Sequence, residues 1–305
     1  PIVRYSDIAG ELAVRRPSFD LCCEGASRFV LGLCKKILLS DRFAELCAAF
    51  RASGEKSVLF YWLYAVSFTL QIYFDFSGYS DMAIGLGKIF GFHFPENFDH
   101  PYASKSITEF WRRWHMTLGS WFRDYVYIPL GGNRRGKGRW FFNIFVVWFL
   151  TGFWHGADWQ FIVWGLMYAV LLTLEKLFLL EKLEHAPKVL RHIYVLFFTL
   201  MGFVIFNANS ISAAFLDIGG LFGANGTALS SPEALYYLKS YAPVLIFGAV
   251  ASTPLFSVLK EKAKSKKPLC NAAKLLLPIV LCAGLLLCTA YLVDGSFSPF
   301  LYFRF

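Results

Sequence analysis

Long apolar runs decide what this chain can fold into. A helix needs about 20 residues at 1.5 Å each to cross about 30 Å of hydrocarbon. No alternation of apolar and polar residues is long enough for barrel strands, so helices are the structure that satisfies the backbone in lipid. The sequence therefore predicts an all-α, polytopic transmembrane protein. The candidate spans are residues 57–74, 140–155, 159–180, 189–208, 242–259 and 275–293.

Composition and charge point the same way. Only 17% of the 305 residues are charged and 56% are hydrophobic, whereas soluble domains carry about 25% charged residues. A net charge of +9 can indicate a nucleic-acid binder, but here Lys and Arg stand in short blocks between apolar runs. That distribution favours membrane orientation, so we expect membrane lipid and no nucleic acid as a partner. The seven Cys and six His show neither a disulfide framework nor a zinc-ligand spacing, and no metal is expected.

The basic blocks also predict which loops face the cytoplasm. Lysines are frequent between residues 260 and 274, whereas the loop 209–241 has a single one, so the first should be cytoplasmic and the second outside. Counting back places the basic turn 134–139 inside. Residues 1–56 do not fit this count. Either the amphipathic stretch 27–50 crosses the membrane or enters it partway, or the number of spans counted here is wrong by one.

Polar and ionisable residues gather among aromatics between residues 73 and 159. At the start of this segment, Gly78 can end one helix and Ser80 or Asp81 can cap the next. Further on, the pattern Ser-Ile-Thr-Glu from Ser106 is a capping box that predicts a helix start. The helix expected from there to Pro129 is amphipathic, which favours a position along the interface or beside a cavity.

Two histidines are the strongest functional candidates in this segment. His115 has aromatic and apolar residues at helical spacing, so we expect it to point toward an aromatic face. His155 ends an apolar run one residue before Gly156, and the small residues Thr151 and Gly152 on its face should leave room beside the imidazole. An ionisable residue at membrane depth indicates a functional site. The alternative for His155 is a buried histidine that hydrogen-bonds to a carbonyl.

The basic turn that follows the amphipathic helix also has an alternative interpretation. Gly131 to Gly138 is one residue from a phosphate loop, but Gly138 occupies the Ser/Thr position and an apolar span follows. We interpret it first as a cytoplasmic turn and second as a contact for a phosphorylated donor.

Several motifs together resemble the membrane-bound O-acyltransferase family, and the nearest branch looks like the bacterial alginate and peptidoglycan O-acetyltransferases. Family members usually carry further spans ahead of a Pro-Ile-x-Arg-Tyr motif, so the chain is similar to the C-terminal two-thirds of one and looks like a piece of something longer. The motifs are Pro1–Tyr5, Phe74–Met82, Glu109–His115, Trp121–Tyr125, Ile128–Asn133, Phe153–Gly156 and Ser298–Phe305.

The resemblance implies a reaction and a set of residues. Family members move an acyl group to a hydroxyl on an exported polymer through a tunnel across a ring of helices, with interfacial or re-entrant helices around it. The tunnel histidine would be His155 and its companion His115. The resemblance also implies one membrane-embedded domain over 1–305, with an amphipathic leading segment 1–56 and a catalytic core segment 73–159. Candidates for lining the tunnel or contacting substrate are Asp75, Asp81, Trp111, Trp114, Arg123, Asp124, Asn133 and Trp154.

The same resemblance implies the donor and the partners. Acetyl-coenzyme A is the expected donor on the cytoplasmic side, with no bound cofactor. An exported polysaccharide and an extracytoplasmic SGNH-type acetyltransferase are the expected partners, and the bacterial inner membrane is the expected location. Two alternatives stay open: D-alanyl transfer to teichoic acid, and a non-enzymatic transporter. A transporter usually shows paired broken spans in two related halves, and we find no internal repeat. Direct transfer and a covalent acyl-histidine are both compatible with the residues.

Overall fold

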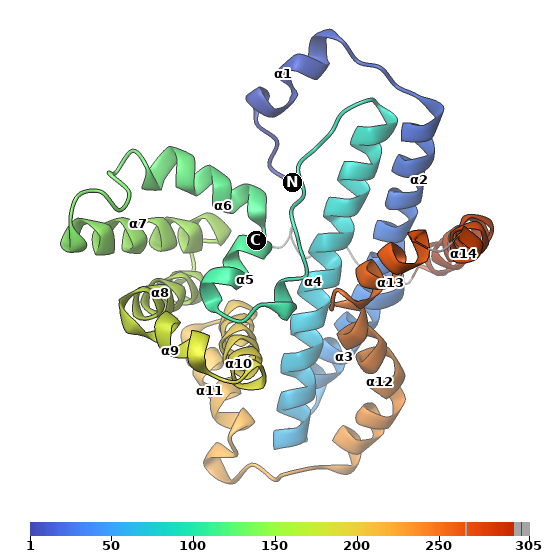
Figure 1. The fold of residues 1–305 in the computed structure, drawn as a ribbon. Helices are drawn as coiled ribbons and strands as arrows, with labels where there is room; N and C mark the ends of the chain where they lie inside the picture. The colour runs from blue at the N-terminus through green and yellow to red at the C-terminus, as the bar shows by residue number, and fades with distance from the viewer. Residues whose placement is uncertain (266, 296–299, 301–305) are drawn as a thin grey trace. The chain divides into compact units, whose positions relative to one another are not determined.

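The computed structural model describes residues 1–265, 267–295 and Phe300, and within these residues every regular element is a helix. Except for Phe300, the predicted motif 298–305 lies outside the described residues. The all-α prediction is confirmed. The helices in Figure 1 are α1 (Tyr5–Ala13), α2 (Phe19–Cys34), α3 (Asp41–Ala52), α4 (Val58–Ile89), α5 (Ile107–Arg113), α6 (Met116–Phe122), α7 (Lys137–His155), α8 (Trp159–Leu174), α9 (Leu180–His185), α10 (Lys188–Phe206), α11 (Ile211–Leu221), α12 (Pro232–Ala251), α13 (Leu255–Lys264) and α14 (Lys267–Val293).

Shorter helical turns connect several of these helices. Three of them are π-helical, a form that occurs mostly as single turns within α-helices. They are η1 (Lys35–Ser40), η3 (Arg123–Tyr127) and η4 (Glu175–Leu179), and the 3₁₀ turns are η2 (Pro101–Ala103) and η5 (Ala224–Gly226).

Four helices are long and apolar enough to cross a membrane: Trp159–His185, Lys188–Phe206, Pro232–Ala251 and Leu275–Val293. They match four of the six predicted spans. The predicted spans 57–74 and 140–155 lie in α4 and α7, which are helical but outside this group of four. Whether α4 and α7 cross the membrane stays a prediction.

The predicted boundaries of one span, 242–259, were wrong. α12 ends at Ala251 and α13 begins at Leu255, so the apolar run is broken in the middle. Ser252 and Thr253 turn their hydroxyls back onto the carbonyls of Ala249 and Val250, at 2.8 and 2.7 Å. These local bonds compete with helix continuation, and a proline follows them.

The chain forms two compact units. The first contains residues 1–45, 70–99 and those described after 242, and the second contains 46–69 and 100–242. The segment 73–159 is therefore divided between them at residue 99. One acyltransferase domain over 1–305 stays a prediction.

In the first unit, α2 and α4 approach each other through glycines. A Cβ on Gly32 would lie 2.6 Å from the carbonyl oxygen of Gly78, and one on Gly25 would lie 2.5 Å from that of Gly85. α4 runs through Gly78 without interruption, so the expected helix end there was wrong. Gly78 permits close packing of two backbones, as small residues do between membrane helices, and does not end the helix.

Candidate functional site

His155 is the last residue of α7, and Gly156 caps the helix as predicted. The backbones of α7 and α8 lie close together. A Cβ on Gly165 would lie 2.3 Å from the carbonyl oxygen of Trp148, and a Cβ on Gly152 would lie 2.5 Å from the carbonyl oxygen of Phe161. Figure 1 shows the two helices joined by a short turn. The space that we expected beside Gly152 is thus filled by α8, and Gly152 serves helix packing.

Aromatic rings surround the imidazole of His155. The centroids of Trp164 and Phe206 lie 5.2 Å from it, at interplanar angles of 88° and 83°, and that of Trp154 lies at 4.9 Å. These are edge-to-face arrangements, which orient a ring as well as burying it. α7, α8 and α10 each supply one of these rings. His155 is therefore held at the end of its helix by contacts from three helices, and its side chain is only partly buried.

His115 lies next to the same cluster. Its ring centroid is 6.1 Å from that of Trp154, and 5% of the residue is exposed. Burial lowers the pKa of His115 well below its ordinary value, and the neighbouring His155 adds to the effect. The imidazole of His115 is therefore neutral at pH 7. The two predicted catalytic histidines are both brought to Trp154.

The backbone at His115 differs from the predicted helix. Trp114 is extended, and His115 has φ 46° and ψ 51° in the left-handed region, so α5 ends at Arg113 and α6 begins at Met116. The continuous amphipathic helix expected from Ser106 to Pro129 was wrong. Among the described non-glycine residues, only His100 shares a positive φ. Such conformations are sparsely populated and cluster at functional sites.

A buried carboxylate fixes the start of α5. Ser106 caps the helix as predicted, accepting a hydrogen bond from the Glu109 N–H at 3.0 Å. In addition, Glu175, 1% exposed at the first position of η4, accepts hydrogen bonds from the N–H groups of Ile107 and Thr108 at 2.6 and 2.8 Å. The Thr108 hydroxyl donates a third at 2.7 Å. Negative charge at a helix N-terminus is stabilising. Glu175 is not among the residues that the sequence pattern singled out.

Trp111 contacts a second layer of aromatic rings. Its centroid lies 4.7 Å from Trp148, 4.8 Å from Tyr168 and 5.6 Å from Trp164. Trp164 belongs to both layers. The indole N–H groups of Trp111 and Trp164 are buried and have no hydrogen-bond partner among the described residues. Buried donors are nearly always paired, so these two indole N–H groups are available to donate to a bound molecule.

The other predicted residues have different surroundings. Trp114 is buried between Phe110 and Phe203 and belongs to the core. Arg123 pairs with its neighbour Asp124 at 2.7 Å. The exposed Asn133 lies in the glycine turn.

Asp75 and Asp81 belong to the first unit and to ion pairs there. The Lys36 ammonium contacts Asp75 and Asp41, at 2.8 Å each, and all three side chains are buried. Asp81 accepts from Arg28 at 2.9 Å and from Lys35 at 2.6 Å. These pairs join α4 to the segment that contains α2 and η1. Within the described residues no group of three or more His, Cys, Asp or Glu could hold a metal ion.

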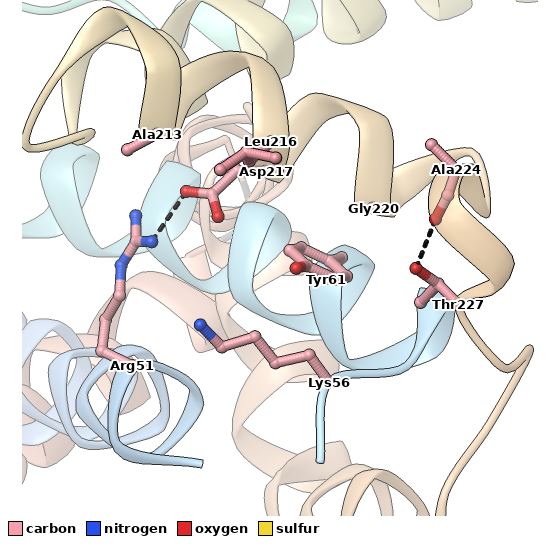
Figure 2. A pocket seen from close by; sticks show the side chains of 9 residues that line it. All are labelled: Arg51, Lys56, Tyr61, Ala213, Leu216, Asp217, Gly220, Ala224 and Thr227. Atoms are coloured by element: carbon pink, nitrogen blue, oxygen red, sulfur yellow. Dashed lines mark hydrogen bonds and ion pairs between the residues drawn. The ribbon is translucent and has the colours of Figure 1, made fainter. Parts of the chain in front are cut away.

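A pocket of about 360 Å³ in the second unit was missed by sequence reasoning (Figure 2). None of its lining residues is a predicted site residue, because its walls come from segments far apart in the chain. They are Arg51, Lys56, Tyr61, Ala213, Leu216, Asp217, Gly220, Ala224 and Thr227.

The family match and the similar proteins agree on one family. Residues 24–216 match the membrane-bound O-acyltransferase family. The chain is 35% identical to "Probable alginate O-acetylase AlgI" of Azotobacter vinelandii over 100% of this chain and 66% of that protein. It is 34% identical to the "Peptidoglycan O-acetyltransferase" of Helicobacter pylori over 85% of this chain and 51% of that protein.

A more limited similarity extends to a different acyl transfer. The "Teichoic acid D-alanyltransferase" of Bacillus subtilis is 41% identical over 36% of this chain and 30% of that protein. The chain spans between about half and two-thirds of the length of the alginate and peptidoglycan relatives described above. With its long apolar helices it is an integral membrane protein, and it belongs to the membrane-bound O-acyltransferase family.

Proposed function

We propose that this protein is an O-acetyltransferase that moves acetyl groups from a cytoplasmic donor across the bacterial inner membrane for O-acetylation of an exported polysaccharide. The observation that carries the proposal is the pair His155 and His115, both next to the ring of Trp154, inside a family whose members transfer acyl groups. The names of the alginate and peptidoglycan relatives favour an acetyl group and a polysaccharide acceptor.

The imidazole of His155, in its neutral form, can act in two ways. As a general base it accepts the proton of the acceptor hydroxyl while that oxygen attacks the acyl carbonyl, and the proton then goes to the departing thiolate. As a nucleophile it attacks the acyl carbonyl and displaces the thiolate, which takes up the imidazole proton. The acyl-histidine then passes the acyl group to the hydroxyl, whose proton returns to the imidazole. In both routes the buried indole N–H groups of Trp111 and Trp164 are available to hydrogen-bond to the substrate.

Acetyl-coenzyme A is the donor in this proposal, and an SGNH-type transferase outside the membrane receives the acetyl group. Deleting a neighbouring gene for such a transferase should stop polymer acetylation while this protein is still present. Undiminished acetylation by this protein alone, purified from its full coding sequence, would rule out the handover. D-alanyl transfer is the second candidate, supported by the partial similarity to the Bacillus subtilis protein. Supplying either acetyl-coenzyme A or a D-alanyl carrier thioester to the purified protein separates the two.

Replacing His155 by alanine tests the proposal directly. Removing a well-placed general base costs about 10²- to 10⁴-fold in rate, so His155→Ala should nearly abolish polymer acetylation while membrane insertion is unchanged. His115→Ala should also lose activity. The matched control is His185→Ala, because His185 is exposed at the end of α9. Full acetylation by His155→Ala at normal expression would refute the assignment.

A further inference from the structure

We propose that the pocket in Figure 2 binds the phosphodiester headgroup of an anionic phospholipid, with phosphatidylglycerol as the specific case. A lipid site there goes beyond the proposed function and does not depend on it. The pocket's volume of about 360 Å³ falls within the range of about 300–1,000 Å³ for small-molecule sites. A cavity of that size can hold a headgroup while the acyl chains stay outside it.

The position of the pocket along the chain places it at the level of the headgroups. Its walls come partly from α11 and η5, which connect the end of α10 at Phe206 with the start of α12 at Pro232. Both α10 and α12 are long and apolar enough to cross a membrane. α11 has 11 residues, so its length of about 16 Å is too short for about 30 Å of hydrocarbon. The connection between the two spans therefore lies at one membrane surface, and the pocket lies there with it.

The lining of the pocket carries one net positive charge. Arg51 and Asp217 neutralise each other, with Nη1 of Arg51 at 2.7 Å from Oδ2 of Asp217 (Figure 2). Lys56 has no carboxylate partner among the described residues, and its ammonium lies 4.9 Å from the ring centroid of Phe50. A phosphodiester has a single negative charge and would balance Lys56 through a charge-assisted hydrogen bond. A zwitterionic headgroup would bring a second ammonium and leave the charge of Lys56 unbalanced.

A second donor lines the pocket on a wall that is already fixed. The hydroxyl of Tyr61 has no hydrogen-bond partner among the described residues, so it can donate to a phosphate oxygen. The neighbouring Trp62 donates its indole N–H to the carbonyl of Leu221 at 2.9 Å. The N–H of Val58 donates to the carbonyl of Ala228, also at 2.9 Å. These bonds hold the start of α4 against α11 and the residues after η5, so little ordering is needed when a ligand binds.

Apolar side chains on the segment that supplies most of the pocket's walls suit the acyl chains of a lipid. Leu216 lines the pocket itself. Large exposed apolar groups next to a polar pocket mark a membrane or ligand contact. A phospholipid would use both parts of this surface, whereas a soluble phosphate ester would use only the charged part. The exposed side chains are Phe215, Leu216, Phe222 and Leu229, with exposed fractions between 60% and 81%.

Counting bound lipids tests the proposal. The protein, made from its full coding sequence and purified in detergent, is titrated with phosphatidylglycerol and, separately, with phosphatidylethanolamine, and native mass spectrometry measures binding of the first lipid. The wild type should favour phosphatidylglycerol by about fivefold or more, the factor expected for one lysine at an anionic headgroup. Lys56→Gln should lose this preference and Lys56→Arg should keep it. Tyr61→Phe should weaken phosphatidylglycerol binding by about threefold. The matched control is Lys239→Gln, an exposed lysine on α12 that is not part of the pocket.

Three results would overturn the proposal. They are equal binding of the two lipids by the wild type, equal phosphatidylglycerol binding by the wild type and Lys56→Gln, and displacement of the first phosphatidylglycerol by an equal concentration of sn-glycerol 3-phosphate. The last would assign the pocket to a soluble phosphate ester. Because binding is measured without an acyl donor, none of these results bears on the proposed function.

Discussion

Replacing Glu175 would show how the segment carrying His115 is held. The Glu175 carboxylate accepts three hydrogen bonds from the first turn of α5, at 2.6 to 2.8 Å, and is 1% exposed. Glu175→Ala leaves two N–H groups and one hydroxyl without this acceptor. At about 1–3 kcal/mol for each orphaned buried donor, stability should fall by about 3 kcal/mol or more.

Glu175→Gln should lower stability less, because one side-chain oxygen still accepts a hydrogen bond. The amide nitrogen would nevertheless face a donor, and the negative charge is lost, so we expect a loss of stability of about 1.5–3 kcal/mol. Thermal unfolding in detergent, followed by the helical circular dichroism signal, measures both variants. Glu181→Gln is the matched control because Glu181 is exposed on the neighbouring α9, where a substitution should change stability by less than about 0.5 kcal/mol. If Glu175→Ala unfolded at the same temperature as this control, the capping role would be refuted.

Three further predictions concern packing, protonation and orientation. Gly165→Ala should lower the unfolding temperature because the new methyl group would meet the Trp148 carbonyl. Gly138→Ala, at a position of α7 with nothing within 4 Å, should leave it unchanged. Equal unfolding temperatures of the two variants would contradict the close packing of α7 and α8. Since burial lowers the pKa of His115, the unfolded chain binds a proton there below about pH 6.5 and the folded chain does not, so stability should fall with decreasing pH at up to about 1.4 kcal/mol per unit. His115→Gln should flatten this slope between pH 7 and 5, and an unchanged slope would exclude His115 as its source. With the native Cys removed, a single Cys in 222–230 should react with an impermeant thiol reagent in intact cells and one in 261–267 should resist. The reverse pattern would invert the predicted topology.

Features that depend on composition over long stretches of the chain could be predicted from the sequence. The apolar runs predicted four membrane-length helices, because hydrophobicity over about 20 residues hardly depends on tertiary contacts. The end of α7 at His155 was also predictable, since an apolar run stops there before a glycine.

Features that depend on partners distant in sequence could not be predicted. Gly78 matches a helix terminator locally, and only the approach of α2 shows that it is a packing glycine. Glu175 caps a helix that begins 68 residues earlier. The helical periodicity around His115 gave no sign of a left-handed residue, because neighbouring turns on both sides keep the same apolar pattern.

The ring cluster beside the histidines has an optical consequence. Trp111, Trp148 and Trp164 lie within 4.7 to 6.2 Å of one another, and Trp154 contacts both imidazoles. These four indoles are nearly half of the nine in the chain. Indoles at such separations exchange excitation energy, so light absorbed by any of them is emitted from the one lowest in energy. Emission from this group should therefore respond to a change beside His155, whose ring centroid lies 4.9 Å from that of Trp154 and 5.2 Å from that of Trp164, so the arrival of an acetyl group there would be visible without a label.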